Sequence, residues 1–160
     1  MGRQTRRRRP DATRRLPTIQ QVRLTPIAHN FDLGGRWRLS RLVFDFSEGT
    51  FLRGTGEMQA VADGARLWRL QETLIFNEFE AQRDSLWQIV GQSLHLRYAD
   101  GAPLVVLDLT QGTAEDAHLC APDRYLARFK TLELDRFKLS WRVTGPRKNY
   151  AMVTDYRRLG

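Results

Sequence analysis

The spacing of the hydrophobic runs is the feature that most constrains the fold of this chain. From Gly34 onward, apolar residues recur at every second position in about ten runs, which is the period of a β-strand with one buried face. The segments between the runs, such as "ADG" and "GPRK", are too short for the helix that a parallel crossover needs, so consecutive strands should be antiparallel neighbours. The predicted strands span residues 35–45, 51–61, 65–76, 79–90, 93–99, 103–109, 113–120, 123–132, 136–144 and 149–158.

An open sheet of this many antiparallel strands would leave two edges with unpaired backbone groups. Closing the sheet on itself removes both edges, which favours an all-β, antiparallel up-and-down β-barrel of about ten strands. A barrel of this size usually has room inside for a small ligand. A two-sheet sandwich is the alternative that the same pattern leaves open.

Charge divides the chain into two parts. The net charge is +8, but residues 1–28 hold eight arginines and one aspartate, whereas residues 29–160 hold 18 basic and 17 acidic residues. The first part has three prolines and an arginine run, which predicts a disordered basic tail over residues 1–28 and a barrel domain over residues 29–160. Residues 3–15 are candidates for non-specific contact with nucleic acid or an anionic membrane. Alternatively, the tail is merely solvated or precedes the true start of the protein.

The cysteine content and the absence of targeting signals favour a cytoplasmic protein. Cys120 is the single cysteine, so neither an internal disulfide nor a cysteine-based metal motif is possible. No stretch has the length of a membrane span, and no apolar segment follows the arginines as an export signal would require.

Two charged residues fall on strand faces that otherwise belong to the interior. Glu72 shares its face with Trp68, and Arg83 shares its face with Trp87 on the following strand. A lone buried charge is unfavourable, whereas a paired one is tolerated. The two residues could therefore pair with each other, either as a structural ion pair or as part of a ligand site.

The segment "DAHLCAPDRY" supplies further candidates. Asp116, His118 and Cys120 fall on one face, and Tyr125 lies on the next strand. His118 is either a ligand-binding or catalytic residue or a hydrogen-bonded core histidine. No nucleophile motif, phosphate loop or metal triad accompanies it, so we predict no metal site.

The last hairpin, "WRVTGPRKNYAMVTDYRR", is rich in cations. Arg142 points away from the face of Trp141, and both faces of the final strand are mixed. If Tyr150 faces inward, Lys148 lines the cavity with it, and a cation beside a phenol is a good receptor for a carboxylate or phosphate. We therefore select Arg142, Lys148 and Tyr150 as candidate ligand-binding residues. The alternative is that these cations only solvate the turn.

Several segments resemble a family of uncharacterised bacterial and fungal proteins with a calycin-like barrel. They are "FDLGGRWRLSRLVFD" (31–45), "FLRGTGEMQA" (51–60), "RLWRLQETL" (66–74), "AHLCAPDRYLARF" (117–129) and "WRVTGPRKNYAMVTDYRR" (141–158), and "GPRKNY" is the most specific of the motifs. The resemblance covers most of residues 31–158. It implies a barrel fold related to lipocalins and fatty-acid-binding proteins, and it implies no particular activity.

Two comparisons with calycins concern single motifs. "GRW" at residues 35–37 is similar to the lipocalin Gly-x-Trp opening, which implies that Trp37 closes the barrel base with Arg157 or Arg158 stacked on it. Fatty-acid-binding barrels hold a carboxylate with Arg-x-Tyr, and "KNY" at Lys148–Tyr150 is similar in type only.

Together these observations predict a protein that binds a small, partly apolar anion inside the barrel, without catalysis or a cofactor. The candidate ligand-binding residues are Glu72, Arg83, His118, Tyr125, Arg142, Lys148 and Tyr150. One alternative is an enzyme of isomerase or lyase type, in which His118 is the acid or base and Tyr or Arg side chains are its partners. Another is a haem-binding barrel of the nitrobindin kind, with His118 as the axial ligand.

Overall fold

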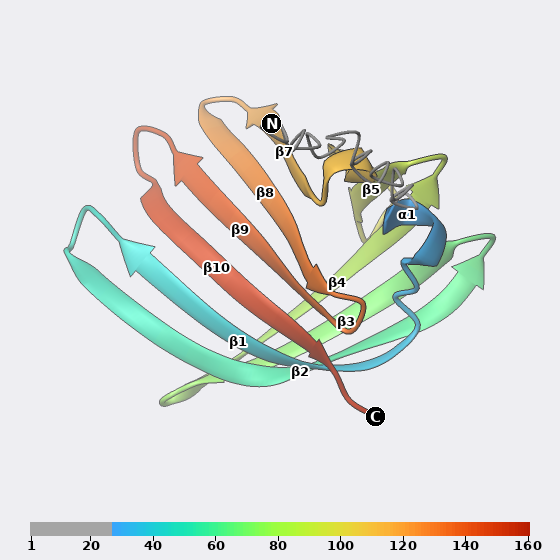
Figure 1. The fold of residues 1–160 in the computed structure, drawn as a ribbon. Helices are drawn as coiled ribbons and strands as arrows, with labels where there is room; N and C mark the ends of the chain where they lie inside the picture. Colours follow the sequence, from blue (N-terminus) through green and yellow to red (C-terminus); the bar gives the residue numbers. More distant parts are fainter. Residues whose placement is uncertain (1–26) are drawn as a thin grey trace, which may run out of the picture.

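The computed structural model describes residues 27–160, and these residues form a nearly closed β-barrel (Figure 1). Its helical elements are α1 (Ile27–Asn30) and the 3-10 turn η1 (Leu109–Gln111). Its strands are β1 (Gly35–Asp45), β2 (Thr50–Gly64), β3 (Leu67–Phe76), β4 (Phe79–Val90), β5 (Ser93–Tyr98), β6 (Pro103–Asp108), β7 (Thr113–Cys120), β8 (Asp123–Glu133), β9 (Arg136–Thr144) and β10 (Asn149–Arg158). The expected all-β fold of ten antiparallel strands is confirmed, and the sandwich alternative is wrong.

The strands form one sheet in the order β6-β5-β4-β3-β2-β1-β10-β9-β8-β7. β1 and β10 pair over nine positions, from Trp37 with Arg158 to Asp45 with Tyr150, so the first and last strands are neighbours. β6 and β7 lie at the two ends of this order and do not continue the ladder. A side chain bridges them instead, because the backbone N–H of Val106 donates to Asp116 Oδ2 at 2.7 Å.

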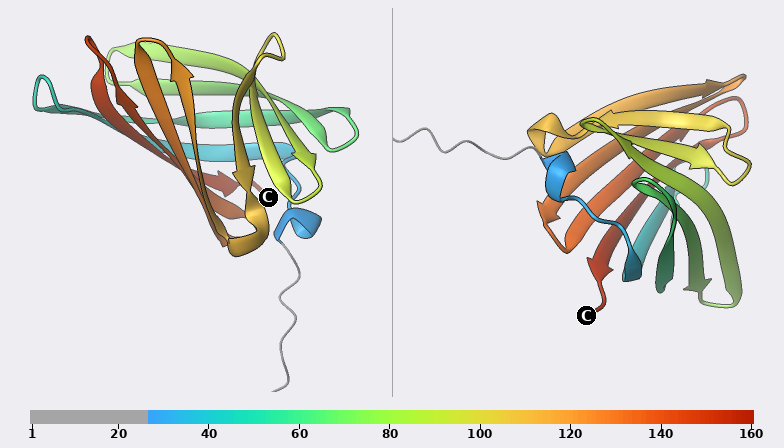
Figure 2. Two further views of the ribbon diagram at one scale, coloured as in Figure 1. Left: turned by 90° about the horizontal axis from the view of Figure 1, so that it is seen from above. Right: turned by 90° about the vertical axis from the view of Figure 1, so that its right-hand side faces the viewer.

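The two ends of the barrel differ. The hairpins β1–β2, β7–β8 and β9–β10 extend freely at one end, which we call the open end (Figure 1). The short helix α1 lies across the other end, the base, beside η1 (Figure 2). Ala28 is fully buried there, and the Phe31 ring packs edge-on against Phe129 and Phe137 at 5.8 and 5.6 Å. The base is therefore closed by apolar residues that precede β1.

The tail expected over residues 1–28 falls almost entirely outside the described residues, and its proposed contacts through residues 3–15 remain a prediction. Its last two residues are an exception, because Ile27 and Ala28 belong to α1 and pack on the core. Ile27 and Ala28 therefore pack with the barrel, because these apolar side chains cover the base. In residues 27–160, no helix is long and apolar enough to cross a membrane.

The lower half of the interior is solid. Phe137 stacks on Tyr156 with ring centroids 4.4 Å apart, and its ring also contacts Trp37 at 5.1 Å. Alternation along the strands explains this packing, since every second residue of β1, β9 and β10 points inward. Open space inside the barrel is consequently restricted to the half that faces the open end.

Candidate functional site

A cavity of about 320 Å³ lies within the barrel towards its open end. Residues from six strands line it, namely Arg83 and Asp84 of β4, Tyr98 of β5, Leu104 of β6, Tyr125 of β8, Trp141 and Val143 of β9, and Tyr150 and Met152 of β10. Three of the residues selected from the sequence, Arg83, Tyr125 and Tyr150, meet here. One wall is apolar, and the rest carries a cation and three phenols, because the alternation of β4 turns the Asp84 carboxylate outward.

Arg83 is the free cation of this cavity. It is exposed at the open end, and in residues 27–160 no ion pair or hydrogen bond holds its guanidinium. Its charge acts on the phenols around it: burial raises the pKa of Tyr98 and of Tyr150, and the Arg83 charge opposes both shifts. These phenols therefore stay protonated at neutral pH and can donate hydrogen bonds beside an uncompensated positive charge.

Lys148 lies near the cavity, and its ammonium group already has two protein partners. Its ammonium donates to the hydroxyl of Tyr125 at 2.8 Å and forms an ion pair with Asp123 at 2.9 Å. These hydrogen bonds, first that to Tyr125 and then that to Asp123, raise the pKa of Lys148. Lys148 therefore holds Tyr125 in place and contributes little free charge.

A buried polar network lies directly below the cavity, and its residues were not selected from the sequence apart from Glu72. Arg41 Nη2 donates to Glu72 Oε2 at 2.8 Å, and Arg41 Nε donates to Thr154 Oγ1 at 2.7 Å. Tyr156 donates to Glu72 Oε1 at 2.7 Å. Thr154 is two positions from Met152 on the same face of β10, so the network lies next to the cavity on the side of the base, although none of its residues lines the cavity.

All four residues of this network are buried. Burial, followed by the Glu72 charge, raises the pKa of Tyr156. Burial by itself would lower the pKa of Arg41, but Tyr156 and Glu72 outweigh it and raise the pKa. A signal for Arg41 was present in the sequence, because it alternates with Trp37, Leu39 and Val43 on the inward face of β1.

The expected pair between Glu72 and Arg83 is wrong at the level of side chains. The two residues are directly opposite each other in the β3–β4 register, as adjacent strands require. The Glu72 carboxylate, however, crosses the interior to Arg41 and Tyr156, and both of its oxygens are used there. Within residues 27–160, Arg83 is therefore left without a carboxylate partner, and its guanidinium is available in the cavity.

His118 lies on β7, half-buried, and it does not line the cavity. Its ring is edge-on to Tyr98, with centroids 6.3 Å apart. It is therefore a neighbour of a wall residue and is not part of the cavity lining. In the described residues, no group of three or more His, Cys, Asp and Glu side chains could hold a metal ion.

Arg142 lies outside the barrel. Its guanidinium covers the Phe46 ring at 4.5 Å and donates to the carbonyls of Val143 and Tyr150 and to Asn149 Oδ1. The alternation of β9, which directs Trp141 and Val143 inward, already turns Arg142 outward. Arg142 thus braces the β9–β10 hairpin, and the structure does not bring it into the cavity.

Trp37 and Arg158 meet at the base. The Arg158 guanidinium lies 4.3 Å from the centre of the Trp37 ring, and the indole N–H donates to the carbonyl of Leu33 at 2.8 Å. Arg158 also donates to the carbonyls of Asp32 and Gly34. Of the two arginines considered, Arg158 is the one that stacks on Trp37, and it ties the segment before β1 to the end of β10.

The fold and the cavity define an antiparallel β-barrel with a closed base and an internal site at the open end. The chain belongs to a family of unknown function, DUF6314, which matches it over residues 33–158. No protein with a curated description matches the sequence.

Solved structures with the same fold are only distantly related in sequence. The S-type phycobiliprotein lyase CPES from Guillardia theta has a TM-score of 0.63 at 12% identity, over 83% of this chain and 90% of that one. A protein of unknown function from the DUF3598 family of Nostoc punctiforme has a TM-score of 0.56 at 14% identity, over 82% of this chain and 49% of that one. EF1p2_mFAP2b bound to DFHBI has a TM-score of 0.50 at 8% identity, over 84% of this chain and 98% of that one. At such identities the likeness concerns the fold.

Proposed function

We propose that this protein is a calycin-like binding barrel that holds a small, partly apolar anion in the cavity at its open end. Arg83 supplies the counter-charge, and Tyr98, Tyr125 and Tyr150 supply hydrogen-bond donors. The apolar part of the ligand lies against Trp141, and the remaining apolar wall is Leu104, Val143 and Met152.

The unpaired Arg83 is the observation that carries this proposal. A guanidinium presents donors in a planar fork that matches a carboxylate, phosphate or sulfonate group. Arg41, Arg142 and Arg158, by contrast, are each held by protein acceptors. Arg83 faces three phenols and an indole without a protein anion on it, so an anionic ligand would be the natural partner.

The composition of the cavity also supports a ligand rather than water alone. Small-molecule sites are mostly apolar with a few convergent polar groups, and their usual volumes begin at about 300 Å³. The cavity of about 320 Å³ fits this description at the small end. Of the two proteins with a similar fold, one is a phycobiliprotein lyase and the other, EF1p2_mFAP2b, is bound to DFHBI. This supports the proposal at the level of fold.

Binding without catalysis is favoured over the two alternatives. Both the isomerase or lyase alternative and the haem alternative assign the central role to His118, which lies beside Tyr98 and outside the lining of the cavity. A cytoplasmic location remains part of the proposal, and it agrees with the single free cysteine, Cys120.

Two probes that share one apolar body test the proposal. Anilinonaphthalene sulfonate is anionic, and N-phenylnaphthylamine is neutral. We expect the full chain to bind the anionic probe, and Arg83→Met to weaken that binding by about tenfold, as for loss of a charge-assisted hydrogen bond. Binding of the neutral probe should change by less than about twofold, since the wall is intact.

Arg69→Met is the matched control, because Arg69 is on β3, pairs with Asp63 on the outside, and has no part in the cavity. Equal effects of the two substitutions on the anionic probe would overturn the proposal. In a second experiment, native mass spectrometry of the protein from its source organism identifies the bound molecule as an added mass that disappears on denaturation. An added mass that survives in Arg83→Met at full occupancy would also contradict the assigned role.

A further inference from the structure

The outer face of the barrel carries a concentrated patch of positive charge that the cavity does not explain. It extends across the base half of four neighbouring strands, β8, β9, β10 and β1. We call it the basic band, and its members are Arg38, Lys130, Arg136, Lys138 and Arg157. All five belong to the outward-facing alternate positions of their strands.

Register places like charges directly against each other within the basic band. Arg38 is opposite Arg157 in the β1–β10 pair, and Lys130 is opposite Lys138 in the β8–β9 pair. Like charges in such cross-strand positions destabilise a sheet. The fold gains nothing from these two pairs, so a partner outside the barrel is the better explanation for them.

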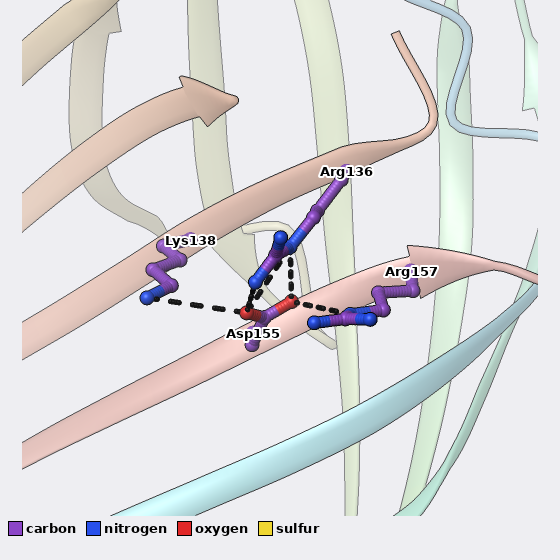
Figure 3. Close-up of polar contacts among 4 residues, drawn as sticks. All are labelled: Arg136, Lys138, Asp155 and Arg157. Carbon is purple, nitrogen blue, oxygen red and sulfur yellow. Dashed lines mark hydrogen bonds and ion pairs between the residues drawn. The ribbon is translucent and has the colours of Figure 1, made fainter. Parts of the chain in front are cut away.

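A single carboxylate, Asp155, is enclosed by the basic band (Figure 3). It bonds Arg136 at 2.7 Å, and it has longer ion pairs with Arg157 at 3.5 Å and Lys138 at 4.0 Å. The hydrogen bond from Arg136 lowers the pKa of Asp155, which therefore remains charged. One negative charge among three positive ones orders the side chains and still leaves a surplus.

The other carboxylates near the band lie at its margin. Glu133, the last residue of β8, is the register partner of Arg136, whereas Asp135 in the β8–β9 turn pairs with Arg158. Glu57 on β2 is the register neighbour of Arg38 but forms its ion pair with Arg36. Asp155 and Glu133 together oppose two of the five positive charges of the basic band. The surplus is therefore not neutralised within the described residues.

Exposed aromatic rings continue the same outer face towards the open end. Phe44 and Phe51 are a cross-strand pair with rings stacked 6.5 Å apart, and they are 46% and 64% exposed. Phe46 beside them is 48% exposed, and Arg142 covers one side of its ring. Leu42 and Val153 lie between these rings and the basic band in the register. Cations and apolar rings thus share one continuous sheet surface.

We infer that this outer face binds single-stranded nucleic acid, with phosphates on the basic band and bases against Phe44 and Phe51. Cations that follow the backbone combined with exposed rings that accept bases characterise such sites. A double helix would need an element that enters a groove, and this convex sheet face offers none. A second copy of the chain would bring one basic band against another.

The sequence before the barrel agrees with a polyanionic partner. Eight arginines precede Ile27, where the described chain begins, and α1 lies at the base, the same end as the basic band. A strand of nucleic acid is long enough to meet both. This inference is independent of the ligand proposed for the cavity.

Fluorescence anisotropy of a labelled oligothymidine with the full chain tests the inference. The decisive variant is Lys130→Gln/Lys138→Gln, and the matched control is Arg69→Gln/Arg97→Gln, which removes the same charge from β3 and β5 across the barrel. We expect the first to weaken binding by about tenfold and to reduce the salt slope by about 1.4, or about 0.7 for each lost phosphate contact. The control should change affinity by less than about twofold, because both variants keep the arginines before Ile27.

Two further variants separate this partner from other polyanions. Asp155→Asn should tighten oligothymidine binding by about threefold, since it removes the enclosed negative charge. Phe44→Ala/Phe51→Ala should weaken oligothymidine binding by about tenfold, as expected for loss of base stacking, and leave heparin binding unchanged. Thermal unfolding confirms that each variant is folded.

Three results would overturn the inference. The first is that Lys130→Gln/Lys138→Gln and Arg69→Gln/Arg97→Gln weaken binding equally, which would mean that only the net charge of the protein matters. The second is an unchanged oligothymidine affinity in Phe44→Ala/Phe51→Ala. The third is binding that depends on the basic band with anionic vesicles or polyglutamate, but not with oligothymidine.

Discussion

Tyr156 donates a hydrogen bond to Glu72 at 2.7 Å in the interior of the barrel, although the two residues are 84 positions apart in the sequence. The same carboxylate receives Arg41 on its other oxygen. A charge pair that is removed from water is tolerated only when its remaining hydrogen-bonding groups are satisfied, and Tyr156 and Thr154 do this here. The interior next to the cavity therefore depends on contacts between strands that are distant along the chain.

Removal of the Glu72 charge should be strongly destabilising. Glu72→Gln leaves the buried Arg41 guanidinium without its counter-charge, and we expect a loss of about 3–5 kcal/mol in the free energy of unfolding. Urea denaturation measures it. Glu57→Gln is the control, because the Glu57–Arg36 pair has the same chemistry but is 51% and 63% exposed, and it should lose less than about 1 kcal/mol. Similar losses in both variants would contradict the importance of burial.

Tyr156 should make the barrel sensitive to alkali. Its pKa is raised in the folded state, so the unfolded chain releases this proton first, near pH 10, and the stability that Tyr156 contributes falls as pH rises above that value. We expect Tyr156→Phe to lose about 1–3 kcal/mol at neutral pH, because Glu72 loses a donor. Its unfolding free energy should then decline less steeply than that of the wild type above pH 10.

Urea denaturation across this pH range checks the alkaline prediction. Tyr98→Phe serves as the comparison. Burial raises the pKa of Tyr98 too, but Tyr98 is 39% exposed and no hydrogen bond in the described residues engages its hydroxyl, so its removal should change the pH profile less than that of Tyr156. Parallel pH profiles for the wild type and Tyr156→Phe would show that another group governs the alkaline loss.

Gly56 should not accept a side chain. A Cβ at this position would lie 1.8 Å from the carbonyl oxygen of Thr73 on the adjacent strand, and a backbone atom cannot move aside as a flexible side chain would. We expect Gly56→Ala to lose about 3 kcal/mol or more, at the upper end of the range for overpacking. Thermal unfolding measures this loss. The neighbouring exposed substitution Thr55→Ala should lose less than about 1 kcal/mol, and a Gly56→Ala protein as stable as Thr55→Ala would refute the prediction.

Arg158 should not be replaceable by lysine. It covers the Trp37 ring and donates to two carbonyls and to Asp135, a set that requires the planar fork of a guanidinium. Both Arg158→Lys and Arg158→Ala should therefore lower the midpoint of thermal unfolding. The decrease for Arg158→Lys should be at least half of the decrease for Arg158→Ala. Arg157→Lys, on the opposite face of the same strand, should be nearly neutral. Full rescue by lysine would mean that charge alone matters.

The strands were predictable from the sequence because alternation and short connections are local features. The turns at Gly91 and Gly101 illustrate this, since both glycines adopt the positive φ that a tight hairpin needs. The antiparallel order followed from the length of the connections. The inward position of Arg83 also followed from alternation. For Tyr150 the inward position was assumed, because both faces of the last strand are mixed, and the structure agrees with that assumption.

The partners of the inward residues were not predictable in the same way. Which residues meet across a barrel depends on strand tilt and stagger, and these are properties of the closed sheet rather than of any one strand. Glu72 illustrates this, because its register neighbour is Arg83 whereas its bonding partner is Arg41 across the interior. For Arg142 the alternation correctly indicated an outward side chain. Its selection as a ligand-binding residue rested on its closeness in sequence to Lys148 and Tyr150, which does not determine on which face a side chain lies.

The bridge between Val106 and Asp116 has a consequence for the capacity of the interior. Every other pair of neighbouring strands is joined along its length by backbone hydrogen bonds, whereas β6 and β7 meet through a side chain. Separation of this pair would break fewer hydrogen bonds than separation of any other neighbouring pair. We therefore expect the barrel to widen first between β6 and β7 when it admits a molecule larger than the cavity.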